Sequence, residues 1–353
     1  MKRIYEEIIA VYLSVFCFKT EHMSVYNQIL CMPIPMIYFN RYRFIHYYLK
    51  QTKPAVVLLL PMMKKKTAGV KLLFIVNPGS GSGEINFPEV ITAYFADKPN
   101  DFEIYTLSVS CSIEKINAAI KKSKANRVIA VGGDGTLKLV AECLFETKTP
   151  IGIIPAGSAN GMARELGIPT DIQQALDLAL NGNAKQIHAV IVNGELCIHL
   201  ADIGFNAYLV KKFDALPQRG MMGYAKAAWK ALWSHHKMQV EIKIKDQLIN
   251  SQAAMVVIAN ATMYGTGVKI NPDGKLDDGL FEVILVKEYS VMEILKIRFT
   301  NLPFNPKNIE SFQTDSLNIK TKHKAHFQVD GEYRGKVNSI KARIITNAVH
   351  IIH

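Results

Sequence analysis

The chain has 353 residues, of which 49% are hydrophobic and 20% are charged. This length exceeds what one compact core usually holds, so we expect two domains, and the composition excludes a disordered chain. The formal net charge of +12 suits partners that carry negative charge, such as nucleotide phosphates or an anionic membrane.

The positive charge is concentrated at the start of the chain. Residues 1–66 hold ten Lys or Arg and three Asp or Glu, a net charge of +7, which leaves +5 for all the rest. Because the rest is only mildly basic, we expect no nucleic-acid partner. The five cysteines are odd in number and none shows Cys-x-x-Cys spacing, which favours free thiols in a reducing cytoplasm.

Residues 1–66 lack the steady apolar period of a helix or a strand. Their apolar run 8–18 is shorter than the roughly 20 residues that cross a bilayer. Met62 and Met63, followed by three lysines, resemble a second beginning. We therefore expect an N-terminal extension over 1–66 that reflects a start assigned too early, with a basic membrane-contact segment as the alternative.

From residue 70 to 190 the pattern alternates between strands and helices, which predicts a parallel sheet covered on both faces. The predicted strands are 71–76, 102–107, 127–131 and 150–154, and the predicted helices between them include 113–124 and 137–145.

From residue 191 to 353 strand follows strand, which predicts a second domain built as an antiparallel β-sandwich. We expect its C-terminal segment to return to the cleft between the domains. One stretch, 222–233, has helical spacing with Trp and Lys side chains, so it either contacts a membrane or packs on the sandwich. The predicted strands are 190–192, 196–202, 239–244, 253–259, 279–286, 316–319, 326–329 and 339–346.

Three glycine-rich loops, 77–83, 132–136 and 155–161, each follow a predicted strand. Ligands of open parallel sheets bind at the carboxyl ends of the strands, and glycine lets backbone N–H groups approach an anion closely. Three such loops on one edge predict a polyphosphate site. The spacing matches neither a Walker P-loop nor a Rossmann fingerprint.

Asp134 lies inside the second loop between glycines. A carboxylate there would repel phosphates unless a cation lay between them, so we expect it to hold Mg²⁺ directly or through water. The alternative is a turn residue whose side chain bonds to its own backbone.

The three motifs resemble the diacylglycerol kinase catalytic family, which includes bacterial lipid kinases and sphingosine kinases and is distantly related to NAD kinases. Asn77-Pro78, Gly132-Gly-Asp-Gly-Thr136 and Pro155-Ala-Gly-Ser-Ala-Asn160 carry the resemblance, which extends over residues 70–353. It implies an α/β plus all-β protein, with an NAD-kinase-like nucleotide domain followed by a β-sandwich that accepts the lipid. It implies ATP in the cleft between these domains and Mg²⁺ as the cofactor.

The resemblance also assigns residues. Catalysis would fall to Glu332 as general base and to Asp134, and a structural magnesium turn would use Leu276, Asp278 and Leu280. The nucleotide-contacting positions would be Asn77, Pro78, Gly79, Thr106, Gly132, Gly133, Asp134, Gly135, Thr136, Leu137, Lys138, Gly157, Ser158 and Asn160.

The chain departs from the family pattern after the second loop. The family usually has an apolar residue, Asn and Glu, where this chain has Leu137, Lys138 and Leu139. Glu142, one turn later, is a candidate for the missing acid, and Lys138 is a candidate for direct contact with phosphate. The family's common threonine is Ser158 here, which keeps the hydroxyl.

These features predict a cytoplasmic enzyme, peripheral to the membrane, that transfers the γ-phosphate of ATP to the hydroxyl of a diacylglycerol or a sphingoid-like lipid at a membrane surface. Two alternatives stay open: an NAD-kinase-like enzyme, and a nucleotide- or lipid-binding protein weakened in catalysis. Association with a second copy of the chain also stays open.

Overall fold

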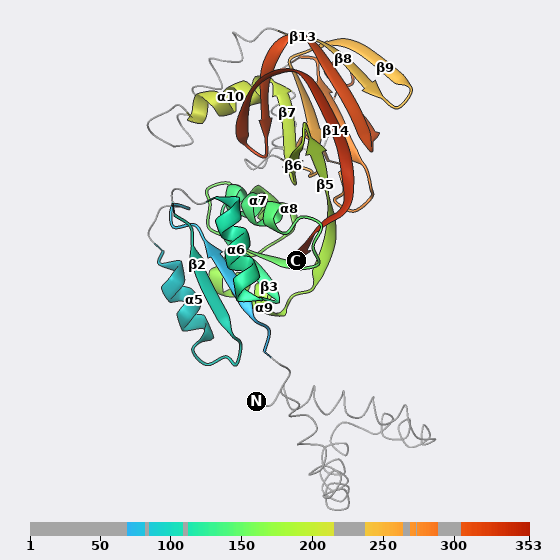
Figure 1. The fold of residues 1–353 in the computed structure, drawn as a ribbon. Coiled ribbons are helices and arrows are strands. Elements are labelled where there is room, and N and C mark those ends of the chain that lie inside the picture. Colours follow the sequence, from blue (N-terminus) through green and yellow to red (C-terminus); the bar gives the residue numbers. More distant parts are fainter. Residues whose placement is uncertain are drawn as a thin grey trace, which may run out of the picture. The chain divides into compact units, whose positions relative to one another are not determined.

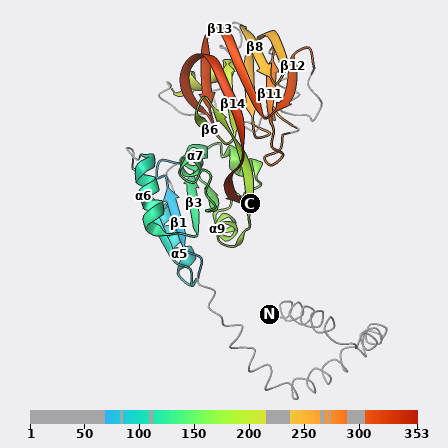
Figure 2. The same ribbon diagram turned by 45° about the vertical axis from the view of Figure 1, so that its right-hand side comes forward.

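The computed structural model describes residues 69–81, 85–108, 112–214, 237–263, 269–272, 274–288 and 305–353. All of them belong to one compact unit, Gly69–His353, drawn in colour in Figures 1 and 2. The N-terminal extension and the helix expected at 222–233 lie outside the described residues. No helix in the described ranges is long and apolar enough to cross a membrane.

The first half contains the parallel sheet that the sequence predicts. Its strands lie in the order β4-β3-β1-β2, and every neighbouring pair is parallel. All five residues of β1 are buried, as expected for a strand covered on both faces. The four strands are β1 (Leu72–Val76), β2 (Phe102–Thr106), β3 (Arg127–Gly132) and β4 (Ile151–Pro155).

Helices cover both faces of this sheet (Figures 1 and 2). Leu72 and Phe74 of β1 pack with α5 (Phe87–Phe95) and α9 (Ile172–Asn181). The alternate residues Leu73 and Ile75 pack on the other face, because successive strand side chains point to opposite faces. The helices on that second face are α6 (Ile113–Ser123), α7 (Asp134–Cys143) and the short α8 (Gly161–Glu165).

Helix α7 begins three residues before the predicted helix 137–145. Asp134, Gly135 and Thr136 form its first turn, although their glycine-rich sequence predicts a loop. Thr136 is 2% exposed, so its tertiary packing outweighs the weak helix propensity of glycine and aspartate.

The second half is the predicted antiparallel β-sandwich, and it encloses a separate apolar core. Helix α10 (Phe205–Asp214) follows β7 directly and was not predicted. The strands are β5 (Ala184–Val192), β6 (Glu195–Cys197), β7 (Leu200–Gly204), β8 (Met238–Ile244), β9 (Gln247–Ala253), β10 (Met255–Ala259), β11 (Phe281–Val286), β12 (Ile309–Thr314), β13 (Ser316–Val329) and β14 (Glu332–Ile352).

Several strand boundaries differ from the prediction. Segment 196–202 divides into β6 and β7, whereas 316–319 and 326–329 are parts of one long strand, β13. Strands β9 and β12 were missed because polar residues dominate them, and each leaves most of its side chains exposed or half-buried.

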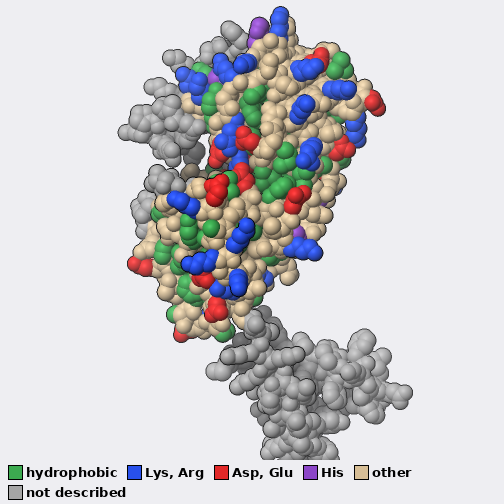
Figure 3. Space-filling view, viewed as in Figure 1, with side chains coloured by type: hydrophobic (Ala, Val, Ile, Leu, Met, Phe, Trp, Pro, Cys, Tyr) green, Lys and Arg blue, Asp and Glu red, His purple; other side chains and the backbone are tan. Residues whose placement is uncertain are grey.

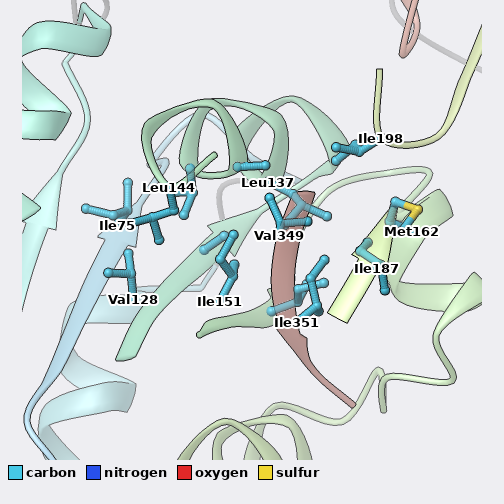
Figure 4. Packing of buried hydrophobic residues seen from close by; sticks show 14 of the residues in the cluster. Ile75, Val128, Leu137, Leu144, Ile151, Met162, Ile187, Ile198, Val349 and Ile351 are labelled. Carbon is cyan, nitrogen blue, oxygen red and sulfur yellow. The ribbon is translucent and has the colours of Figure 1, made fainter. Parts of the chain in front are cut away.

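Strand β14 links the two halves. It pairs with β13 and β5 in the sandwich, and its end pairs with β4 in parallel at Ile351 and Ile151. Val349 and Ile351 belong to the apolar core of the first half, where Val349 lies beside Leu137 of α7 (Figure 4). The C-terminal segment therefore ends in the sheet and the apolar core of the first half, whereas the sequence predicts it at the cleft between the domains.

Candidate active site

The three glycine-rich loops lie at the carboxyl ends of β1, β3 and β4, which are neighbours in the sheet. The Asn77 Nδ2 amide donates a 3.1 Å hydrogen bond to Thr136 Oγ1, which joins the first loop to the second. The second and third loops touch through backbone, because a Cβ on Gly157 would lie 2.5 Å from Gly133 Cα. Only glycine permits that approach, so the three predicted motifs form one continuous surface.

Asp134 binds the third loop. Its two carboxylate oxygens accept hydrogen bonds from the backbone N–H groups of Gly161 (2.8 Å) and Met162 (3.0 Å), at the start of α8. Neither sequence hypothesis included this capping role. Lone pairs on both oxygens remain free to bind a cation, so the carboxylate fits the expected role as a ligand of Mg²⁺. Its position is already fixed by the two hydrogen bonds and needs no cation.

The Asn160 side chain binds the backbone of its own loop and does not point outward to a ligand. Its φ is 51°, its Oδ1 accepts from the Gly157 N–H (2.9 Å), and its Nδ2 donates to the Gly157 carbonyl (2.7 Å). The side chain thereby fixes the turn that presents the backbone of Gly157 and the exposed Ser158.

The remaining nucleotide candidates lie around the same edge. Pro78 and Gly79 follow β1, where the Gly79 N–H donates to Asn77 Oδ1 (3.0 Å). Thr106 ends β2 opposite Val76 of β1 and is exposed. Leu137, in contrast, is 2% exposed and packs in the apolar core, so only its backbone is available to a ligand.

A tight hairpin brings two acids to the second loop. Asp330 and Gly331 both have positive φ, 51° and 83°, as a two-residue Asp-Gly turn between β13 and β14 requires. The next residue is Glu332. A Cβ on Gly135 would lie only 4.0 Å from Glu332 Oε1, so the expected base and the glycine-rich loop are adjacent.

The two acids of this hairpin differ in their surroundings. The Asp330 side chain is 3% exposed, and its carboxylate accepts hydrogen bonds from the N–H groups of Ile198 (3.1 Å), His199 (2.9 Å) and Leu200 (3.2 Å). The Glu332 side chain is 45% exposed. Asp330 therefore anchors the turn, and Glu332 is the acid that can reach a substrate.

Lys138 lies between the loop and the hairpin. Its side chain is 3% exposed, and Nζ is 3.7 Å from Glu332 Oε2 and 3.9 Å from Asp330 Oδ2. Neither distance is a hydrogen bond, and Nζ has no hydrogen-bond partner among the described residues. The structure thus aims this ammonium at the two acids, next to the expected phosphate site.

Three neighbours complete the charge cluster. Arg334 donates from Nη2 to Glu332 Oε2 and from Nε to Glu195 Oε2, both at 2.6 Å. Burial raises the pKa of the Glu142 carboxyl above its ordinary value, an effect that the charge of Lys138 opposes and that of Glu332 reinforces. Sequence reasoning named Glu142 but missed Arg334 and Glu195, since their meeting depends on strand pairing.

The expected magnesium turn lies apart from these loops in the sequence, before β11. The Asp278 carboxylate accepts from the Leu280 N–H (3.0 Å), and the Leu276 carbonyl accepts from the His188 N–H (2.7 Å). All three expected metal-ligating atoms are oxygens, which suits a hard cation such as Mg²⁺. Only one is a carboxylate, and the described residues contain no group of three His, Cys, Asp or Glu arranged around one point.

Comparison with known proteins agrees with this fold. Residues 71–192 match the diacylglycerol kinase catalytic domain, and residues 201–353 match the YegS C-terminal NAD kinase beta sandwich-like domain. The two matches together cover most of the chain and support its assignment to the diacylglycerol kinase catalytic family, as a kinase.

Individual relatives agree with that assignment. The chain is 27% identical to a diacylglycerol kinase of Bacillus subtilis over 271 residues, which covers 74% of this chain and 89% of the relative. It is 29% identical to a probable YegS-like lipid kinase of Chromohalobacter salexigens, over 58% of this chain and 69% of the relative. A solved diacylglycerol kinase structure from Bacillus anthracis shares the fold with a TM-score of 0.64 at 21% identity, covering 82% of this chain and 98% of that one.

A substitution of Asp134 tests whether it does more than cap α8. Asp134→Asn keeps one acceptor but places an NH₂ group against a backbone N–H, so the free energy of unfolding should fall by about 1–3 kcal/mol. Loss of charge near the phosphates should also lower turnover per folded molecule on the order of 10²-fold. Urea denaturation and kcat at saturating substrates measure the two effects.

Asp171→Asn is the matched control, because Asp171 caps α9 by accepting from the Gln174 N–H (2.9 Å). It should reduce stability without changing kcat. If Asp134→Asn behaves in the same way, Asp134 is a helix cap and has no part in catalysis.

Proposed function

We propose that the protein transfers the γ-phosphate of ATP to the hydroxyl group of a membrane lipid, with diacylglycerol or a sphingoid-like lipid as acceptor. The observation that carries the proposal is the position of Glu332, whose exposed carboxylate lies beside Gly135 of a glycine-rich loop at the carboxyl edge of a parallel sheet. A phosphate-binding surface and a base are thereby adjacent, which phosphoryl transfer to an alcohol needs.

The loops would bind the polyphosphate through backbone N–H groups. The first turn of α7 starts inside the second loop, so the positive end of its helix dipole lies at the same edge. Mg²⁺ would supply charge neutralisation for the phosphates, with Asp134 as the carboxylate that the second loop offers to it.

Glu332 would accept the proton of the lipid hydroxyl as the phosphoryl group is transferred. Arg334 orients that carboxylate by its hydrogen bond to Oε2, which leaves Oε1, the oxygen nearer Gly135, for the substrate. Asp330 fixes the hairpin by its three backbone hydrogen bonds, so the base is held rigidly relative to β7.

The test is phosphorylation from labelled ATP of a panel that contains diacylglycerol, sphingoid bases, ceramide and phosphatidylglycerol in detergent, with NAD as a soluble acceptor. Transfer to a lipid supports the proposal and identifies the acceptor. Transfer to NAD alone would support the NAD-kinase-like alternative, and binding of ATP without transfer to any acceptor would support the weakened binding protein.

A further inference from the structure

A basic hollow of ≈ 610 Å³ lies on the sandwich, where α10, β8, β9, β13 and β14 meet. Its described lining contains no Asp or Glu. Figure 3 shows blue and purple side chains together at the upper edge of the sandwich. Six of the lining side chains are Lys or His, namely Lys237, Lys322, His323, Lys324, His326 and Lys336.

Most of this positive charge has no counterion among the described residues. Lys237 is 3.1 Å from a Glu288 carboxylate oxygen, but Lys322, Lys324 and Lys336 make no ion pair within the part of the chain that the structure describes. Lys336 also pairs directly opposite His326 across β13 and β14. Lysine ammonium groups gathered in one hollow repel one another, which costs stability, so the arrangement is explained better by a bound anion than by folding alone.

An aromatic wall borders the hollow. His326 Nδ1 is 2.8 Å from the Tyr333 hydroxyl, and the His326 ring lies 5.2 Å from the Tyr208 ring of α10. Lys211 of α10 extends over the Tyr333 ring at 5.7 Å. Tyrosine beside lysine is the pairing enriched where proteins meet the head-group layer of a membrane.

The hollow lies on the hairpin that carries the proposed base. Lys336 and Glu332 are four residues apart on β14, a separation of roughly 13 Å along a strand. Tyr333 immediately follows Glu332. An anion held at the hollow would therefore keep Glu332 within reach of molecules in the same lipid layer.

We propose that this basic hollow binds the phosphate head group of an anionic phospholipid and so docks the enzyme on the membrane that contains its acceptor. The inference rests on the proposed function, because a kinase whose acceptor is a lipid must reach it at a surface. The volume lies within the usual range of about 300–1,000 Å³ for ligand pockets. Clusters of four or more basic side chains are what anionic membranes attract.

Vesicle flotation of the full-length protein tests the site. Wild-type protein should float with vesicles of phosphatidylcholine and phosphatidylserine, and should not float with phosphatidylcholine alone. The triple variant Lys322→Gln, Lys324→Gln, Lys336→Gln should bind the anionic vesicles on the order of 10²-fold more weakly, at about fivefold for each lysine.

The matched control removes three exposed lysines from a second basic hollow on the sandwich, through Lys243→Gln, Lys245→Gln and Lys341→Gln. Binding within about threefold of wild type is expected. Thermal unfolding of both variants, and phosphorylation of a detergent-dispersed acceptor, should match wild type. If no acceptor is phosphorylated by any variant, the proposed function fails while the flotation result still decides the docking site.

Three outcomes overturn the docking site. The first is equal weakening by both triple variants, which would mean general charge attraction. The second is unchanged binding of the Lys322, Lys324, Lys336 variant. The third is binding of inorganic phosphate at the hollow, seen by calorimetry, without any preference for anionic vesicles, which would make it a site for free phosphate.

Discussion

Replacing Glu332 by Gln is expected to lower kcat by about 10²–10⁴-fold, the range typical of a lost general base. Gln keeps the size of the side chain and its hydrogen bond to Arg334, but it cannot accept the proton of the lipid hydroxyl. The KM for ATP should change little, because Glu332 lies on the hairpin and not in a phosphate loop. Steady-state kinetics with the lipid identified from the panel measure both constants.

Glu195→Gln is the matched control for this substitution. Glu195 holds the same Arg334 at 2.6 Å, so the variant removes one carboxylate from the same charge cluster without touching the base. It should keep kcat within about tenfold of wild type, since a partly exposed ion pair contributes about 1 kcal/mol or less.

The variant Asp330→Asn tests whether Asp330, and not Glu332, is the general base. Its buried carboxylate accepts three backbone hydrogen bonds, so the variant should be less stable yet retain turnover per folded molecule. Near wild-type kcat in Glu332→Gln together with abolished turnover in folded Asp330→Asn would mean that Asp330 is the base.

The phosphate-type edge could be predicted from the sequence because its signals are local. Each glycine-rich loop directly follows an apolar strand, and parallel strands place their carboxyl ends on one edge. The contacts of Asn77 with Thr136 and of Gly133 with Gly157 therefore follow from the order of the strands. Local sequence could not predict that Asp134 caps α8, because the backbone N–H groups that donate to its carboxylate lie 27 and 28 residues later in the chain.

The position of the hairpin beside the second glycine-rich loop could not be predicted from local pattern. Glu332 was named from a family resemblance, and its place beside Gly135 depends on β13 pairing with β7, more than a hundred residues earlier. The same pairing brings Asp330 to the N–H groups of residues 198–200 and Arg334 to Glu195. Such contacts follow from the topology of a sheet, which hydrophobic period does not determine.

Replacing Lys138 by Met is expected to lower kcat on the order of 10²-fold while leaving the free energy of unfolding unchanged or higher by about 1–3 kcal/mol. Lys138 is a buried ammonium without a hydrogen-bond partner in the described residues, a state that costs stability. Asp330 does not require it, since three backbone N–H groups already stabilise that carboxylate.

Lys287→Met is a suitable control, because Lys287 forms a half-buried ion pair with Glu310 at the β11–β12 edge of the sheet, which β10 and β7 separate from β13 and β14. Loss of that satisfied pair should lower stability slightly and leave kcat unchanged. Urea denaturation and steady-state kinetics on both variants provide the comparison.

The reason to expect a loss of turnover lies in what surrounds Nζ. The nearest carboxylate is the proposed base at 3.7 Å, and Gly135 of the phosphate loop lies beside that same carboxylate. An ammonium there stabilises the Glu332 carboxylate before transfer. It also faces the charge that develops as the proton of the lipid hydroxyl and the phosphoryl group move. A fall in kcat at constant KM for ATP is therefore expected. A rise in that KM at constant kcat would instead place Lys138 on the phosphates of ATP, and a large loss of stability would make it a structural partner of Asp330.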